Sequence, residues 1–414
     1  PTQHPASLAD LQNLTANHGI YSSKDWRLDL KGETFSCSTA RSNGDLFSPH
    51  WFGVSNGTFN AWVVMLGRGG IDVECGATFK ATGAVDKYWF AGTQSTPANQ
   101  FLFRVHGNAS AEFDGDLDRG MREYLGELYS ARYLVDEGGL LSYHPTTMPY
   151  VNKHKATFEN HGVMTFPRGF TATSEMTTAS STGAVEIVQR AGTLHLAGAF
   201  VQQVPDESQA TTFADLRLEG GTTVLSNGVS FADWNLAVAE GAAFALEIPK
   251  GGDFTTDVLT FGEGFALEKK GEGVLRFAVT NEVAAGSVTV SEGVLAGAAP
   301  MNVGTLDVVL AGGALAADPD AADVLAVTDG TVSATGGWKV RTLVPFTGTT
   351  TAIPFLAVAA AADPQLTDAD VTFLNVRGKP VNGKLAKEDV LVGDVPCVRY
   401  SASFSGVGTL LIVR

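Results

Sequence analysis

Residues 265–295 read FALEKKGEGVLRFAVTNEVAAGSVTVSEGVL, and this stretch decides the class of fold. Glycines stand at positions 271, 273, 286 and 293, and short segments that alternate apolar with polar or small residues fill the intervals. Alternation with a period of two is typical of a β-strand with one buried face. The glycines predict sharp turns between strands that are only a few residues long.

The same pattern continues on both sides of this stretch. From residue 162 to 337 two or three alternating apolar residues are repeatedly followed by a glycine, asparagine or acidic turn, as in GAVEIVQ, GTLHLAG, NLAVAEG and GTLDVVLAGG. Turns roughly 8–12 residues apart suit either a β-sandwich or a β-solenoid. The solenoid is favoured because no change in composition closes one sandwich and begins another. Each coil would then take roughly 20–25 residues.

Changes in composition divide the chain into five regions. Residues 1–26 form an N-terminal cap with a short helix over 8–16 that begins in a capping-box pattern. Residues 27–116 are β-structure rich in aromatic residues. Residues 117–161 are an insertion, with a helix near 117–136 indicated by apolar residues at three- to four-residue steps and a long loop after it. The solenoid repeats follow over 162–337, and a C-terminal β region and cap over 338–414.

The opening stretch also carries an ordered set of residue types. It reads Leu-x-Lys-x-Gly-x-Gly-x-Leu, then an asparagine corner, then Gly-x-Val-x-Val-x-x-Gly-x-Leu, and it resembles the autotransporter-associated β-strand repeat of bacterial autotransporter passengers and related surface proteins. The matching residues are Leu267, Lys269, Gly271, Gly273, Leu275, Phe277, Asn281, Gly286, Val288, Val290, Gly293 and Leu295. The resemblance implies a right-handed parallel β-helix that is exported and displayed outside a bacterial cell.

Charge and cysteine content exclude several classes of function. The formal net charge is −16 and no run of Lys or Arg exceeds two residues, which disfavours binding to nucleic acid or to anionic lipid. No stretch approaches the ~18 apolar residues of a membrane-spanning helix. Cys37, Cys75 and Cys397 lack metal-ligand spacing; Cys37 and Cys75 allow a bridge, but we favour three unpaired core thiols.

Asp114, Asp116 and Asp118 are the most suggestive metal ligands in the sequence. Alternating carboxylates can supply several oxygens to Ca²⁺. However, Arg119 and Leu125 stand where an EF-hand loop needs glycine and glutamate. The alternative, which we favour, is a polar turn whose aspartates cap the predicted helix.

The predicted loop contains His144, His154 and His161 together with Glu159. Their spacing places no two histidines on one rigid element, so we expect surface histidines rather than a metal or acid–base site.

Carbohydrate chemistry is the remaining possibility. The carboxylates Asp72, Glu74 and Asp86 are available for polysaccharide cleavage, but no compact Asp/Glu/Arg cluster is evident from coil to coil in the sequence. An exposed aromatic platform for sugar stacking is an alternative to core packing, which we favour, for four residues: Trp51, Phe52, Trp62 and Trp89.

These observations predict a non-enzymatic, extracellular structural or adhesive β-solenoid of the bacterial surface, with no catalytic residue, cofactor or metal. Its expected partners are further copies of itself, in a homo-oligomer, filament or sheath, or surface glycans and proteins. The alternative is a carbohydrate-active β-helix enzyme, either a polysaccharide lyase or a hydrolase.

Overall fold

The computed structural model describes residues 20–21, 25–37, 47–48, 51–61, 65–66, 70–81, 89–90, 101–114, 131–144, 155–173, 184–203, 214–319 and 324–405. The chain divides into two compact units, Pro1–Asn235 and Leu236–Arg414. Over the described ranges the structure consists of strands, turns and three single-turn 3₁₀ helices, at Thr256–Val258, Ala360–Ala362 and Asp368–Asp370, with no α-helix. The all-β prediction is therefore confirmed for this part of the chain. No helix in it is long and apolar enough to span a membrane.

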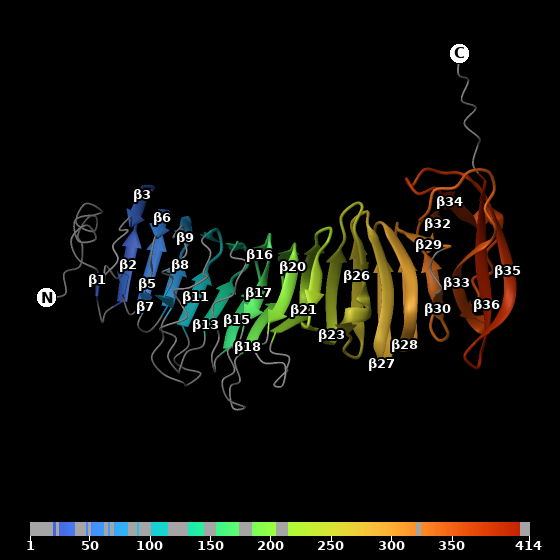
Figure 1. Ribbon diagram of the computed structural model, residues 1–414, viewed down its shortest axis with the longest axis horizontal. Helices are drawn as coiled ribbons and strands as arrows, with labels where there is room; N and C mark the ends of the chain where they lie inside the picture. The colour runs from blue at the N-terminus through green and yellow to red at the C-terminus, as the bar shows by residue number, and fades with distance from the viewer. Residues whose placement is uncertain are drawn as a thin grey trace, which may run out of the picture. The chain divides into compact units, whose positions relative to one another are not determined.

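Two long ladders of strands run through the first unit (Figure 1). The first ladder consists of β2 (Asp25–Asp29), β5 (Trp51–Ser55), β8 (Gly70–Val73), β11 (Phe101–Val105), β13 (Ala131–Val135), β15 (Lys155–Asn160), β18 (Ala184–Gln189) and the start of β21 (Ala214–Leu225). The second consists of β3 (Thr34–Cys37), β6 (Gly57–Ala61), β9 (Ala77–Ala81), β12 (Ser110–Phe113), β14 (Leu140–Tyr143), β16 (Val163–Phe166), β19 (Thr193–Leu196) and the end of β21.

Three shorter ladders accompany them. One joins β17 (Gly169–Thr173), β20 (Ala199–Gln203) and β22 (Ser230–Ala232); the others pair β1 (Ile20–Tyr21) with β4 (Phe47–Ser48), and β7 (Met65–Leu66) with β10 (Trp89–Phe90). Every strand pairing described in this unit is parallel. Parallel neighbours that recur in chain order are consistent with a β-solenoid.

Aromatic side chains fill the interior of the first unit. Because one side chain in two points inward, residues in register form columns inside the coils. One such column contains Phe52, Ile71, Phe103, Tyr133, Phe158, Ile187 and Leu216, all buried. The rings of Tyr133 and Phe158 stack with centroids 4.5 Å apart and planes at 7°. Ring pairs of this kind stabilise a core by ~0.5–1.5 kcal/mol beyond the burial of their area.

The second unit contains two parallel ladders and a terminal sheet. The first ladder joins β23 (Asn235–Glu247), β26 (Phe265–Lys270), β27 (Val274–Val290), β28 (Val294–Leu310) and β31 (Val332–Ala334), and β25 (Leu259–Thr260) also pairs with β23. The second ladder joins β24 (Asp253–Thr255), β27, β28, β29 (Ala314–Ala317), β32 (Trp338–Thr342) and β34 (Val371–Leu374).

The terminal sheet follows the order β30 (Leu325–Val327), β33 (Ile353–Ala359), β36 (Val395–Ser405), β35 (Asn382–Val392). Its last two pairings, β33 with β36 and β36 with β35, are antiparallel. This change of direction ends the succession of parallel pairings.

The length of a coil agrees with the prediction in the second unit only. Between residues 243 and 342, partners in register lie 20 to 25 residues apart, for example Gly286 opposite Leu306 and Leu315 opposite Val340. In the first unit the step ranges from 19 residues, Trp51 to Gly70, to 32 residues, Gly70 to Leu102.

The residues of the opening stretch point largely as predicted. Leu267, Leu275, Val288, Val290 and Leu295 are all buried. Glycines 271 and 293 have φ of +71° and +69°, which favours glycine at these corners. Glycine 286, however, lies inside β27 rather than at a corner, and a Cβ there would come within 2.2 Å of the Phe265 ring. It is needed for space, not for a turn.

Two secondary-structure predictions for the insertion are wrong. The helix near 117–136 does not extend to its predicted end, because residues 131–135 form β13, with Tyr133 and Val135 buried and Arg132 and Leu134 half-buried between them. The predicted long loop contains β14 and β15. The alternation of inward and outward residues in these segments has a period of two, and pairing with adjacent coils supplies their backbone hydrogen bonds. The helix predicted over 8–16 lies outside the described residues.

Candidate functional site

A row of charged residues follows the outer side of the first ladder in the first unit. We call it the charge ladder; its members are Arg27, Asp72, Glu74, Arg104, His106, Arg132, Asp136, Glu159, His161, Glu186, Arg190, Arg217 and Glu219. Some occupy the outward positions of the strands, and the others stand one residue beyond a strand's end. Parallel stacking brings these positions side by side on neighbouring coils.

Asp72 is the central acceptor at the N-terminal end of the charge ladder. It is buried, and its carboxylate accepts hydrogen bonds from Trp51 Nε1 at 2.6 Å and His106 Nε2 at 2.9 Å. The other ring nitrogen of His106 lies 3.3 Å from Asp136, which also accepts a 2.8 Å bond from Arg104. The ring of His106 thus lies between carboxylates of the preceding and the following coil.

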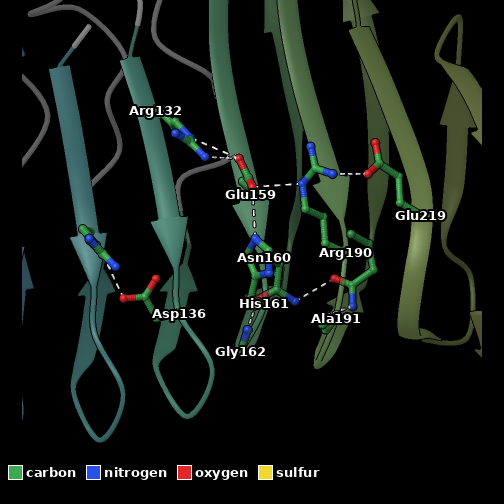
Figure 2. Close-up of polar contacts among 11 residues, drawn as sticks. Arg132, Asp136, Glu159, Asn160, His161, Gly162, Arg190, Ala191 and Glu219 are labelled. Carbon is green, nitrogen blue, oxygen red and sulfur yellow. Dashed lines mark hydrogen bonds and ion pairs between the residues drawn. The ribbon is translucent and has the colours of Figure 1, made fainter.

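Glu159 has the corresponding position further along (Figure 2). It accepts bonds from Arg132 Nη2 at 2.5 Å, Arg190 Nε at 2.9 Å and His161 Nε2 at 3.0 Å, and Arg190 continues the row to Glu219. Burial opposes ionisation of Glu159, but the bonds from His161 and Arg132 and the charges of Arg132 and Arg190 outweigh it and hold its pKa below the usual value. Glu159 is therefore a carboxylate that stays charged and ties three coils together.

A pair of buried amides lies directly beneath Glu159. Asn160 and Gln189 are fully buried, in register with each other and with Val135, at positions where the alternation requires an apolar residue. Asn160 Nδ2 donates to Gln189 Oε1 at 2.6 Å, and Gln189 Nε2 donates to the carbonyl of Ala191 at 2.8 Å. The carbonyl groups at the corner of the coil thus have side-chain partners, as buried polar groups require.

A shallow groove crosses the corners that follow β13, β15 and β18. It has a volume of about 650 Å³, and its charged lining residues are Arg132, Asp136, Glu137, Glu159 and His161. Glycines 162 and 192 also line it, and the corners pack so closely that a Cβ on Gly192 would lie 1.9 Å from the carbonyl oxygen of Gly162. Arg132 and His161 are bound to Glu159. In contrast, Glu137 has no side-chain partner among the described residues.

A buried lysine closes a corner in the second unit. Lys269, the lysine of the repeat, is fully buried and donates from Nζ to the carbonyl groups of Lys270 and Gly271, each at 2.6 Å. Burial lowers the pKa of Lys269 to about 8, although the charges of Glu292 and Glu247 act in the opposite direction. Lys269 in this unit and the Asn160–Gln189 pair in the first unit play the same structural part.

The charge ladder contradicts one expectation from the sequence. Compact groups of Asp, Glu and Arg do recur on successive coils, and the predicted carboxylates Asp72 and Glu74 belong to them through Arg27. Sequence spacing concealed these groups because the coils differ in length. The only signal was a charged residue at or just after the end of successive strands. The third predicted carboxylate, Asp86, lies outside the described residues.

The histidines of the predicted loop do not form one site. His161 joins the charge ladder, whereas His144 lies 2.7 Å from Ser142 Oγ and 3.8 Å from Asp114. His154 lies outside the described residues, as do Asp116 and Asp118 of the predicted calcium group. In the ranges that the structure describes, no group of three or more His, Cys, Asp or Glu could hold a metal ion.

The aromatic residues and the cysteines divide between core and surface. Phe52 is a core residue, whereas Trp51 is half-buried and bonded to Asp72. Trp62 and the side chain of Trp89 lie outside the described part of the chain, as does the side chain of Cys37. Cys75 is a free, exposed thiol and Cys397 is a free, buried one, so the prediction of core thiols is wrong for Cys75.

We compared the chain with known proteins. No family model matches it, and no curated protein sequence matches it.

Proposed function

We propose that the chain is a right-handed parallel β-helix that acts as a structural or adhesive element on the outside of a bacterial cell. The observation that carries this proposal is the charge ladder. Its charged side chains bind one another from coil to coil, and Glu159 alone joins Arg132, Arg190 and His161. Such contacts resist sliding and separation of the coils, which is what a load-bearing or adhesive element requires.

Two further features support this reading. The resemblance of residues 267–295 to the autotransporter-associated repeat favours export and surface display. The resemblance also gains a physical basis from Lys269 and Asn281, since Lys269 closes a corner and Asn281 bonds both the N–H and the carbonyl group of Phe261 on the preceding coil.

Surface display is tested on intact cells of the bacterium that produces the chain. Antibodies raised against the purified chain should label intact cells, and protease added outside should remove the label. Labelling that requires permeabilised cells would refute the proposal. Adhesion is tested with the purified chain on arrays of glycans and surface proteins, where saturable binding is expected.

A polysaccharide lyase or hydrolase is the second candidate, and the groove favours it. Asp136, Glu137 and Glu159 bring carboxylates to one concave surface. Glu159, with its lowered pKa and three donors, is unsuited to act as a general acid. Glu137 is the better candidate because its side chain has no partner among the described residues.

The enzyme hypothesis is tested by incubation with pectin, alginate and glucans. Cleavage by the unaltered chain that is lost in Glu137→Gln, but kept in Glu112→Gln as a matched control, would favour the enzyme over the structural protein. Absence of new reducing or unsaturated ends with all substrates would leave the structural proposal in place.

A further inference from the structure

Strand β35 presents a free edge in the terminal sheet of the second unit (Figure 1). It is the last strand in the order of that sheet and pairs with β36 alone. The two strands are joined by a two-residue turn between Val392 and Val395, in which Gly393 has φ of +59°. A glycine with positive φ at the first turn position is typical of a tight antiparallel hairpin.

The turn determines which residues of β35 face the free edge. In a two-residue hairpin the residues that flank the turn exchange both backbone hydrogen bonds, and bonded and non-bonded pairs then alternate. The even-numbered residues of β35 therefore bond to β36, and the odd-numbered ones direct N–H and C=O outward. Leu385 agrees, since its N–H donates to Asp368 Oδ1 at 2.7 Å. Pro396, which has no N–H, lies opposite Leu391 at a non-bonded position.

Lys387, Asp389 and Leu391 are the outward residues beyond the contact with Asp368. All three are exposed, and Leu391, at 72%, is the most exposed large hydrophobic residue in the part of the chain that the structure describes. No backbone group within the described ranges bonds to the outward N–H groups of these residues. This is a short free edge with a basic, an acidic and an apolar residue in alternate positions.

We propose that this edge binds the same edge of a second copy of the chain, antiparallel and about a twofold axis through Glu388. This inference deepens the proposed function, on which it rests, because it names the partner in self-association. In this register Lys387 lies opposite Asp389 of the second copy and Asp389 opposite its Lys387. Each pair would exchange backbone hydrogen bonds and form an ion pair across the strands.

Charge selects this register over its neighbours. A shift of the axis to Lys387 would place two lysines opposite each other, and a shift to Asp389 would place two aspartates there. The chosen register also brings Leu385 opposite the exposed Leu391 of the second copy. Glu388 meets its own symmetry mate on the other face, but each copy neutralises it with Arg399 at 2.7 Å.

Charged residues on an edge strand commonly prevent association. Here they prevent every register except the one that pairs unlike charges. A twofold contact occupies both edges and closes, so this edge produces dimers, and filaments would need a second kind of contact. Because one strand from each copy is involved, we expect a weak dimer with Kd on the order of 10–100 μM.

The test is the mass of the full chain in solution, measured by analytical ultracentrifugation over a range of concentrations. We expect a monomer–dimer equilibrium that Lys387→Glu weakens at least tenfold. The double exchange Lys387→Asp with Asp389→Lys should restore it. Lys384→Glu, the matched control, makes the same charge change at an even-numbered position of β35 and should leave the equilibrium unchanged.

Monomers at concentrations well above 100 μM would overturn the inference, as would dimers equally weakened by Lys384→Glu or not restored by the double exchange. Either failure leaves surface labelling of intact cells unaffected. Conversely, a chain that dimerises as expected but is absent from the cell surface would refute the proposed function and not this contact.

Discussion

Substituting Gly192 by alanine should disrupt the stacking of the coils beside the groove. Gly192 has φ of +66°, and a Cβ there would lie 1.9 Å from the carbonyl oxygen of Gly162 and 2.8 Å from that of His161. Relief of this overlap requires the two coils to separate, which strains the 2.7 Å bond from Thr193 N to the same oxygen of Gly162.

The expected loss has two parts. A non-glycine residue in the left-handed region costs ~1–2 kcal/mol, and overlap with rigid backbone together with a weakened buried hydrogen bond adds ~2–4 kcal/mol. Gly228→Ala is the matched control, because Gly228 has φ of +79° but nothing within 4 Å of its added Cβ. The control should lose only the first part.

The free energy of unfolding is measured by denaturant titration, with circular dichroism to follow the β-structure. Amide hydrogen exchange at Thr193 shows whether the corner itself opens. We expect Gly192→Ala to be less stable than Gly228→Ala by about 2 kcal/mol or more, with faster exchange at Thr193 only in the former. Equal losses in the two variants would refute the close stacking of these corners.

Three further predictions concern buried polar groups, and each is checked by unfolding titrations. Because the folded pKa of Glu159 is lowered, its stabilisation is present above the unfolded value of about 4.3 and is lost as the pH falls through the folded value; Glu159→Gln should cost ~1–3 kcal/mol at pH 7 and flatten this acid dependence, whereas Glu137→Gln should change stability by less than ~0.5 kcal/mol. Because the pKa of Lys269 falls to about 8 in the folded chain, the unfolded state binds more protons between there and about 10.4, so stability should rise over that interval by an amount on the order of 2–3 kcal/mol that Lys269→Met abolishes; the same slope in both proteins would contradict its burial. Asn160→Leu and Gln189→Leu should each destabilise by ~2–4 kcal/mol, with a coupling of about 1 kcal/mol or more in the double-mutant cycle; strict additivity would mean that the two amides do not interact.

Local pattern was sufficient for much of the second unit. The inward positions of Leu267, Leu275 and Val288 follow from alternation alone, because successive side chains of a strand point to opposite faces. The segment 131–135 failed for a related reason. Its residues, with Tyr133 and Val135 as the buried ones, also fit the three- to four-residue steps of a helix when read together with residues before them. Only pairing with β11 and β15 on adjacent coils distinguishes the two readings.

The roles of polar residues were harder to predict than their positions. Lys269 was visible as part of the repeat, yet nothing in its neighbours along the chain shows that its ammonium group is buried against the carbonyl groups of a corner. Asn160 and Gln189 carried a weak signal, since each interrupts an apolar alternation. Their hydrogen bonds to each other span 29 residues and depend on the register of two coils.

The sequence by itself determined that this chain forms short strands and glycine corners, and which faces of most strands are apolar, because these properties depend on neighbouring residues and a period of two. Only the tertiary structure decided which charges meet. The partners of Glu159 lie 27 and 31 residues away along the chain, and the coils between them differ in length. Contacts across a ladder depend on how many residues each coil uses before it returns, and stacking, rather than local pattern, determines that number.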